Sequence, residues 1–293
     1  MIVITTPAGQ IGRQVLDRVL DSGEPVRVIA RDPSRLSPRV IARAEIVRGS
    51  HGDADTVARA FDGADRVFWL VPPDARHVGG CVRHYLDFTR PACEAIKNQG
   101  VRKVVGVSTL GHGYQGRAGI LSAALAMDNL IEDTGVDYRA LAMPFFMENL
   151  LRQVQAIKDQ GTFFLTNAAD RPLPTVATQD IAAAAAAFLV DGSWHGQGSV
   201  PVVGPDDLTP VGMAQVMSDV LGRAVRYCHI SVADYKAMML RHGASEAVAQ
   251  DVADGLEATE RGIYDAEPRD RHAAAPTSFR RWCQDILKPA VLA

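Results

Sequence analysis

The amino-acid sequence predicts an α/β fold, a doubly wound parallel sheet followed by a small, mostly helical lobe. In the first half of the chain, short β-branched runs alternate with amphipathic stretches that end at a glycine. Such a rhythm with short connections joins parallel strands through right-handed crossovers. The β-branched runs are apolar throughout, which is typical of strands whose two faces are both covered by helices.

Each expected helix of the first half is followed closely by a glycine that can end it. Pro91 is expected to kink the helix that contains it. The expected strands are Ile2–Thr5, Val26–Ala30, Ile46–Arg48, Val67–Val71, Val104–Val107 and Tyr138–Ala142, and the expected helices are Ile11–Leu20, Val57–Phe61, Val82–Asn98 and Leu121–Glu132.

In the second half, polar residues stand where helices would begin. Residues 1–150 are expected to hold most of the sheet, and residues 151–293 a smaller lobe that is interleaved with the sheet rather than independent. The expected helix starts are Thr209-Pro210, Ser231, Ser245 and Thr277 or Ser278, the last for a helix to Leu287, and Thr162–Leu165 and Val200–Val203 are expected strands.

Composition and charge narrow the class of protein. Of the 293 residues, 47% are hydrophobic and 22% charged, and the net charge of −3 gives no general attraction to nucleic acid or anionic lipid. The longest uncharged apolar stretch, Ile181–Val190, is about half a membrane span. The N-terminus lacks the basic region of a signal peptide, so a cytoplasmic protein is expected. The scattered cysteines are expected to be free thiols, and the histidine spacings predict no metal site.

The turn between the first strand and the first helix reads Thr6-Pro7-Ala8-Gly9-Gln10-Ile11-Gly12. Small residues there let the backbone approach a pyrophosphate, and the amides and dipole of the helix favour its negative charge. The turn therefore predicts a dinucleotide site, and the alternative is a tight turn with a purely structural role. The candidate phosphate-binding residues are Thr6, Gly9, Gln10, Ile11 and Gly12.

The chain resembles the NmrA-like, atypical short-chain dehydrogenase/reductase family, which includes quinone reductase-type proteins. Besides Gly9 and Gly12, the resemblance rests on the segments 31–35 (Arg-Asp-Pro-Ser-Arg), 144–150 (Pro-Phe-Phe-Met-Glu-Asn-Leu) and 276–279 (Pro-Thr-Ser-Phe). It implies a Rossmann-like fold with an NAD(P)-binding domain over residues 1–150 and a substrate lobe over residues 151–293. Members include NAD(P)H-dependent reductases and regulators that bind the nucleotide without turnover.

Two departures from the family pattern bear on the chemistry. Thr6 stands at the first glycine of the family's loop, and Pro7 after it removes a backbone donor near the phosphates. The Tyr and Lys positions of ordinary short-chain dehydrogenases, counted back from Asp128, fall on Ile120 and Ala124. Neither side chain donates a proton, so the usual alcohol dehydrogenase mechanism is not expected and no catalytic residue is assigned.

Residues at the strand ends predict which cofactor binds. Arg31 stands where an acidic residue would bind the ribose of NAD, and Arg35 follows one turn later, so the 2′-phosphate of NADP is expected. The alternative is a pair of solvated surface arginines, and Asp32 leaves some room for NAD. The remaining cofactor-binding candidates are Ser50 at the adenine edge, Val71 and Pro72 along the ribose–nicotinamide path, Ser108, which would orient a ligand, and Pro144.

Candidate substrate-binding residues follow the fifth and sixth strands. His112 and Tyr114, in the glycine-rich segment 111–116, are the titratable side chains there that could pass a proton. A mobile, solvated loop is the alternative reading of that segment. Phe145 and Asn149 are expected in the wall of a substrate cleft, with a plain core role as the alternative.

These features predict an NADP(H)-binding oxidoreductase that passes hydride to a quinone-like small molecule. A reduced quinone takes its proton from water, so positioning and water exclusion suffice without an acid. Two alternatives stay open, an NAD(P)-sensing regulatory protein without turnover and a non-redox biosynthetic enzyme on a degenerate Rossmann fold. The expected partner is a small-molecule substrate, and the sequence does not predict an oligomeric state.

Overall fold

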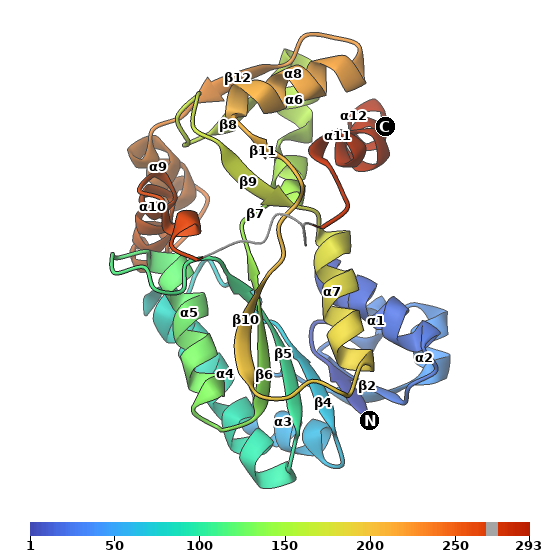
Figure 1. The fold of residues 1–293 in the computed structure, drawn as a ribbon. Helices are drawn as coiled ribbons and strands as arrows, with labels where there is room; N and C mark the ends of the chain where they lie inside the picture. Colours follow the sequence, from blue (N-terminus) through green and yellow to red (C-terminus); the bar gives the residue numbers. More distant parts are fainter. Residues whose placement is uncertain (268–274) are drawn as a thin grey trace.

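The computed structural model describes residues 1–267 and 275–293 and confirms the doubly wound parallel sheet (Figure 1). Its strands lie in the order β10-β6-β5-β4-β1-β2-β3, and every neighbouring pair is parallel. The order reverses beside β1, which creates a switch point where ligands of such sheets bind. The strands are β1 (Ile2–Ile4), β2 (Val26–Ala30), β3 (Ala44–Arg48), β4 (Arg66–Trp69), β5 (Lys103–Thr109), β6 (Asp137–Met143) and β10 (Gln197–Pro201).

Helices cover both faces of this sheet, and each face buries its own apolar cluster. One cluster joins the sheet to α1, α2 and α7, and the other joins it to α3, α4 and α5 (Figure 1). This two-sided burial explains why the strand sequences are continuously apolar. The helices are α1 (Gln10–Asp21), α2 (Pro38–Arg43), α3 (Ala54–Phe61), α4 (Gly80–Gln99), α5 (Gly119–Glu132) and α7 (Thr178–Val190).

A second, smaller body of structure lies beyond the carboxyl edge of the large sheet (Figure 1). It has a three-stranded sheet of β7 (Phe145–Phe146), β9 (Leu173–Val176) and β11 (Asp207–Leu208), and a parallel pair of β8 (Thr162–Leu165) and β12 (Arg226–His229). Its helices are α6 (Val154–Gln160), α8 (Pro210–Leu221), α9 (Val232–Arg241), α10 (Glu246–Glu260), α11 (Phe279–Trp282) and α12 (Lys288–Leu292), with 3-10 turns at Met147–Gln153 and Ile263–Asp265 and a π-helix at Cys283–Leu287. A further 3-10 turn, Pro33–Arg35, follows β2 in the large sheet's part of the chain.

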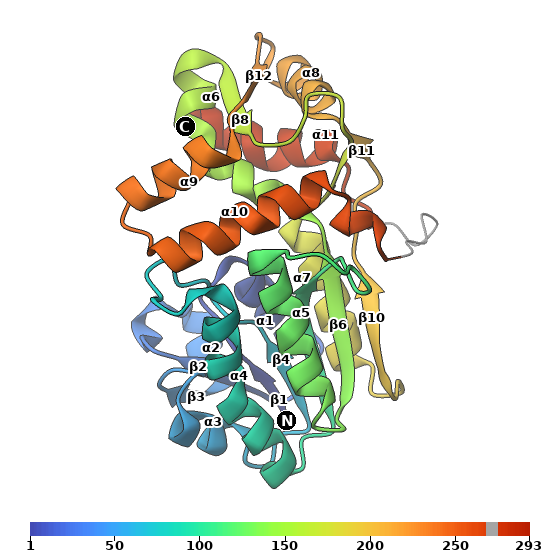
Figure 2. The ribbon, with the colours of Figure 1, turned by 90° about the vertical axis from the view of Figure 1, so that its left-hand side faces the viewer.

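Helix α10 of this lobe lies across the ends of α4 and α5 and so connects the lobe to the helices that cover the sheet (Figure 2). The Asp251 carboxylate accepts a 2.6 Å hydrogen bond from the backbone N–H of Cys81, so it caps α4 from outside. Gly119 at the start of α5 has a φ of +44°, and a Cβ there would lie 1.8 Å from the Asp251 carbonyl oxygen. This approach therefore requires a glycine.

The expected elements are found with boundaries shifted by a few residues. Helix α4 continues through Pro91, and the terminal helical segment continues past Leu287 to Leu292. Short elements such as α2, β7 and β11 were not expected, because two to six residues show no clear periodicity. All four cysteines are free thiols, as expected. In the described part of the chain, no helix is long and apolar enough to cross a membrane.

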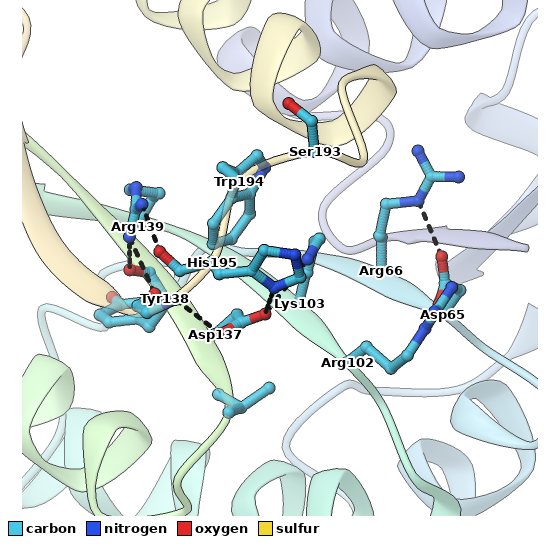
Figure 3. Close-up of polar contacts among 12 residues, drawn as sticks. Asp65, Arg66, Arg102, Lys103, Asp137, Tyr138, Arg139, Ser193, Trp194 and His195 are labelled. Atoms are coloured by element: carbon cyan, nitrogen blue, oxygen red, sulfur yellow. Dashed lines mark hydrogen bonds and ion pairs between the residues drawn. The ribbon is translucent and has the colours of Figure 1, made fainter.

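Charged side chains and the Trp194 indole cover the amino edge of the sheet (Figure 3). The Trp194 ring lies between the Lys103 ammonium and the Arg139 guanidinium, 5.0 and 4.6 Å from the ring centroid. Asp137 accepts hydrogen bonds from the buried Lys103 ammonium at 3.1 Å and from the backbone N–H of Gly196 at 2.7 Å. The connection before β10 thus covers the amino edge, and the opposite, carboxyl edge is the place for a ligand.

Replacing Trp194 with alanine should lower the free energy of unfolding by about 2 kcal/mol, because a half-buried ring and two cation–π contacts are lost. Urea denaturation measures the change. His195→Ala is the matched control, since the His195 side chain is 78% exposed and its removal should cost less than about 0.5 kcal/mol. Equal stability of Trp194→Ala and wild type would show that the cluster does not stabilise the sheet.

Candidate functional site

The turn from β1 to α1 packs its backbone directly against the helix. Thr6 has a φ of +50°, and its carbonyl oxygen accepts a 2.9 Å hydrogen bond from the Gly9 N–H. A Cβ at Gly12 would lie 2.2 Å from the same oxygen, whereas one at Gly9 would lie 3.2 Å away. Gly12 is therefore needed for the close contact of turn and helix. A Cβ at Gly9 would require the Thr6 carbonyl oxygen to move by only a few tenths of an ångström, so a side chain at Gly9 disturbs the turn less than one at Gly12.

The N-terminus of α1 differs from those of most other helices. Its N-cap residue is Gly9, no side chain caps it, and Ala8, Gly9 and Gln10 are all exposed. Since the Ile11 side chain is buried in the core, this residue offers only its backbone to a ligand. The first amides of α1 and the positive end of its dipole are thus open to an anion. Among the described helices, α2, α3, α8, α9, α10 and α11 are capped by a side chain at the N-cap position, and α4 and α7 by a carboxylate from another element, whereas α5, α6 and α12 have no side-chain cap. The capping N-cap residues are Ser37, Asp53, Thr209, Ser231, Ser245 and Ser278.

The Thr6 hydroxyl is the second unusual feature of the turn. Its oxygen is buried and has no hydrogen-bond partner in the described part of the chain. A threonine with φ near +50° is also strained, because only glycine adopts that conformation without cost. Both features sit in the loop that would hold a pyrophosphate, and together with the open helix end they fit an anionic ligand at this turn.

Three exposed arginines stand beside this turn. Arg31 follows β2 directly, and Arg35 ends the 3-10 turn after it. Arg48, at the end of β3, pairs with Ala30 and so lies alongside the end of β2. Arg48 was not among the predicted site residues, because its place beside β2 follows from the strand register. The nearby Asp32 carboxylate accepts hydrogen bonds from the Ser34 hydroxyl and N–H, and these bonds lower the pKa of Asp32.

Ser50 lies in a surface hollow at the end of β3, with a volume of about 340 Å³. Beneath it, burial lowers the pKa of His51 to about 4, so the imidazole is neutral, and its Nε2 lies 2.9 Å from the Leu70 carbonyl oxygen. Val71 is buried after β4 and can offer only its backbone to a ligand. The Pro72 carbonyl oxygen lies 2.8 Å from Nε2 of His84.

At the end of β5 a buried carboxylate organises the site. Asp128 of α5 is fully buried and accepts hydrogen bonds from the Ser108 hydroxyl and, at 2.6 Å, from the Tyr138 hydroxyl. Nε2 of His112 lies 3.4 Å from the same carboxylate. The hydroxyl of Ser108 is therefore oriented into the protein by Asp128. Ile120 is half-buried and Ala124 buried, so no proton donor stands at either position.

His112 is held between two carboxylates rather than in a solvated loop. Its Nδ1 lies 3.1 Å from the Glu267 carboxylate, which also accepts from the Gly111 N–H. Hydrogen bonds to Asp128 and Glu267 raise the pKa of His112 to about 10. The imidazole is therefore protonated at neutral pH, and it ties the β5–α5 connection to the C-terminal part of the chain. Glu267 gave no signal in the sequence, because it lies far along the chain from His112.

The other predicted substrate residues lie at the junction of sheet and lobe. Tyr114 is half-buried and its ring covers Gly116. Pro144 is buried, and Phe145 follows it in β7, where it pairs with Thr175 and is half-buried. Asn149 is half-buried in the 3-10 turn after β7. The structure brings these residues to the same side of the sheet as the β1–α1 turn.

A half-buried carboxylate at this junction, that of Glu148, was not predicted as a site residue. Glu148 accepts hydrogen bonds from the N–H and hydroxyl of Thr178 and, at 3.3 Å, from the Trp282 indole, so it caps α7 from outside. Burial raises its pKa. The Thr178 hydroxyl in turn accepts from Gln14 of α1 at 3.1 Å. These bonds fix the N-termini of α1 and α7 side by side.

The donor set at the carboxyl edge fits a dinucleotide phosphate, and the comparisons with known proteins agree. Residues 8–191 match a family described as NAD(P)H-binding. The chain belongs to this family, and the NmrA-like, atypical short-chain dehydrogenase/reductase resemblance is confirmed.

Two curated relatives and one solved structure illustrate the similarity. The (4-alkanoyl-5-oxo-2,5-dihydrofuran-3-yl)methyl phosphate reductase of Streptomyces griseus is 32% identical over 79% of this chain and 78% of its own length. The NAD(P)H azoreductase of Xenophilus azovorans is 25% identical over 85% and 84%. The Escherichia coli NADPH-dependent quinone oxidoreductase in complex with NADPH superimposes with a TM-score of 0.79 at 21% identity, covering 97% of this chain and 98% of that one. This structure shares the Rossmann-like fold.

Thr6→Gly should raise the free energy of unfolding by roughly 1 kcal/mol, because it relieves the left-handed backbone and removes the unpartnered hydroxyl. Gly12→Ala should lower it by about 2 kcal/mol or more, since the added Cβ meets the Thr6 carbonyl oxygen. Chemical denaturation of both variants checks the pair. A destabilised Thr6→Gly would contradict the strain assigned to this turn.

Stability should depend on the charge of His112. Its pKa is about 10 in the folded protein, against an ordinary value of 6.5, so the protonated form favours folding. The stabilisation is fully present below pH 6.5 and is lost as the pH rises towards 10. The difference in Tm between wild type and His112→Gln should therefore shrink over that range. A difference that stays constant with pH would contradict the assignment, and His195→Gln, at an exposed ion pair, is the control.

Proposed function

We propose that this protein is an NADPH-dependent reductase that passes hydride to a planar, electron-poor conjugated acceptor such as a quinone. The observation that carries the proposal is the open N-terminus of α1 beside three exposed arginines. An uncapped helix end suits a pyrophosphate, and guanidinium groups suit a 2′-phosphate. NADP is favoured over NAD because the Asp32 carboxylate already caps its own turn instead of facing a ribose.

Each strand end contributes a part of the proposed cofactor site. The backbone amides of Gln10 and Ile11 bind the pyrophosphate, with Gly9 leaving room for it. Arg31 and Arg35 bind the 2′-phosphate, and Arg48 adds to the positive potential there. Ser50 lies at the adenine edge, and the remaining positions follow the path of the nicotinamide half along the edge, at Val71, Pro72, Ser108 and Pro144.

The acceptor class follows from the way Ser108 and His112 are already engaged within the described part of the site. The Ser108 hydroxyl donates to Asp128, and both nitrogens of His112 face carboxylates. A bound nicotinamide supplies the hydride, and a quinone that receives it becomes an oxyanion that can take its proton from water. Tyr114, Phe145 and Asn149 then position a flat acceptor and exclude water. The relatives named for quinone, azo and butenolide substrates fit this class, because all of these are conjugated acceptors.

Arg31→Ala should raise the Kd for NADPH by about ten- to a hundredfold and leave the Kd for NADH nearly unchanged, because a charge-assisted hydrogen bond is lost only with the 2′-phosphate. Fluorescence titration with both nucleotides measures the effect. Arg39→Ala is the matched control, since Arg39 is an exposed arginine that pairs with Asp21. Equal losses for the two nucleotides, or none for either, would mean that Arg31 is only a surface residue.

The reductase activity is tested by mixing the protein with NADPH and a panel of quinones. We expect oxidation of NADPH that depends on the quinone, and His112→Gln should lower kcat by less than the ~10²-fold typical of losing a general acid. Loss of all turnover in that variant, with NADPH still bound, would contradict the positioning role. Tight binding of NADPH without any acceptor-dependent oxidation would instead favour the nucleotide-sensing regulator.

A further inference from the structure

Glu148 lies in the segment that carries two of the acceptor-binding residues, but its carboxylate binds a different element. The segment 145–149 follows β6 at the carboxyl edge, and both Phe145 and Asn149 belong to it. The Glu148 carboxylate reaches the first residue of α7. Both of its oxygens accept from the Thr178 N–H at 3.0 Å, and one also accepts from the Thr178 hydroxyl at 2.8 Å. The wall of the proposed acceptor site is therefore bound to α7.

Helix α7 relies on this contact because it has no side-chain cap of its own. Its N-cap residue is Ala177, which has no hydrogen-bonding side chain. Helices α3, α8, α9 and α10, in contrast, are each capped locally by an Asp, Ser or Thr. A local cap satisfies the helix without fixing any other segment. A cap supplied by Glu148 satisfies the same amide and also holds the segment 145–149 in place.

The contact continues to helix α1, whose N-terminus is assigned to the cofactor phosphates. The Thr178 hydroxyl accepts from Nε2 of Gln14 at 3.1 Å, and this nitrogen also donates to the Gln10 carbonyl oxygen at 2.9 Å. Gln10 is the first residue of α1, and α1 and α7 pack side by side in one apolar cluster (Figure 1). The hydrogen bonds of Thr178 to Glu148 and to Gln14 thus connect the acceptor wall to the helix that would hold the cofactor.

The donors around Glu148 require a carboxylate. They include a backbone N–H, a hydroxyl and, at 3.3 Å, the indole N–H of the buried Trp282. Because all three groups donate to Glu148, two oxygens that only accept suit them best. A glutamine has nearly the same shape, but one oxygen becomes an NH₂ group that cannot accept from the Thr178 N–H. Glu148→Gln therefore disturbs the contact with little change in volume.

We propose that Glu148 is a positioning residue for hydride transfer. It does not touch the acceptor. Through Thr178 and Gln14 it holds the segment 145–149 at a fixed place relative to α1, so that the side chains of this segment present the acceptor ring to the nicotinamide. A hydride with its two electrons leaves the reduced nicotinamide, and the quinone oxyanion that forms takes its proton from water. This inference rests on the proposed function, because it requires that NADPH and the acceptor both bind at the carboxyl edge.

The test measures quinone-dependent oxidation of NADPH by the full chain, with kcat expressed per bound NADPH so that an unfolded fraction does not count. Glu148→Gln should lower kcat by about ten- to a hundredfold, because a small displacement of a reacting group slows the reaction strongly. The Kd for NADPH should change by less than about twofold, since the α1 amides and the arginines are not altered. Asp251→Asn is the matched control, because it makes the same change of carboxylate to amide at the cap that α4 receives from outside. It should leave kcat within about twofold of wild type.

A second pair of variants tests the same connection at Thr178 and does not depend on the folding of Glu148→Gln. Thr178→Val removes the hydroxyl that joins Glu148 to Gln14 but keeps the N–H, and it should lower kcat by about tenfold. Thr178→Ser keeps both groups and should restore kcat to nearly the wild-type value. A role in stability alone would lower the Tm of Thr178→Val without changing kcat per bound NADPH.

The outcomes separate this inference from the proposed function. If wild type oxidises no NADPH in the presence of any quinone, the proposed function fails and the positioning role fails with it. Turnover by wild type that is equally fast in Glu148→Gln, or an equal loss in Asp251→Asn, overturns the positioning role alone. A Thr178→Ser variant as slow as Thr178→Val also overturns it, because the hydroxyl is then not the connecting group.

Discussion

The buried carboxylate of Asp128 is the constraint on which the geometry of the candidate active site depends. A charge removed from water is costly unless hydrogen bonds and an opposite charge compensate it. Here the hydroxyls of Ser108 and Tyr138 supply the hydrogen bonds and His112 supplies the charge, so β5, β6 and the β5–α5 connection are held in one arrangement. Glu267 extends the same set of bonds to the C-terminal part of the chain.

The carboxyl edge therefore has two halves with different physical characters. Around Asp128 the described polar groups of Ser108, Tyr138 and His112 satisfy one another, so these groups are engaged with the carboxylate rather than with a substrate. Around α1 the helix amides are open, the arginines are exposed and the Thr6 hydroxyl is unpartnered. The first half suits a surface that positions a reacting ring, and the second suits a polyanion. A reductase whose substrates take their proton from water, and not from a side chain, uses both halves of this edge.

Much of the fold and part of the site could be predicted from the sequence. Apolar runs and glycine-ended helices predict the parallel sheet, because both follow from local periodicity, and Arg31 was found because it directly follows a strand. Arg48, His77 and Glu267 could not be assigned in this way. Arg48 is placed by the strand register, His77 by its hydrogen bond to the Gly80 carbonyl oxygen at the start of α4, and Glu267 by its contact with His112. These relations exist only after folding. In the sequence, Thr6 is visible only as a departure from the glycine of the family's loop. Its φ of +50° shows that this departure strains the backbone.

We infer that the carboxyl edge is built for a dinucleotide that carries a 2′-phosphate. Calorimetric titration of the wild-type protein with NADPH and with NADH at low and high salt tests it most directly. We expect NADPH to bind at least about tenfold more tightly than NADH at low salt, and added salt to reduce this preference because exposed guanidinium groups create it. Equal affinity for the two nucleotides at both salt concentrations, or no binding of either, would contradict the account.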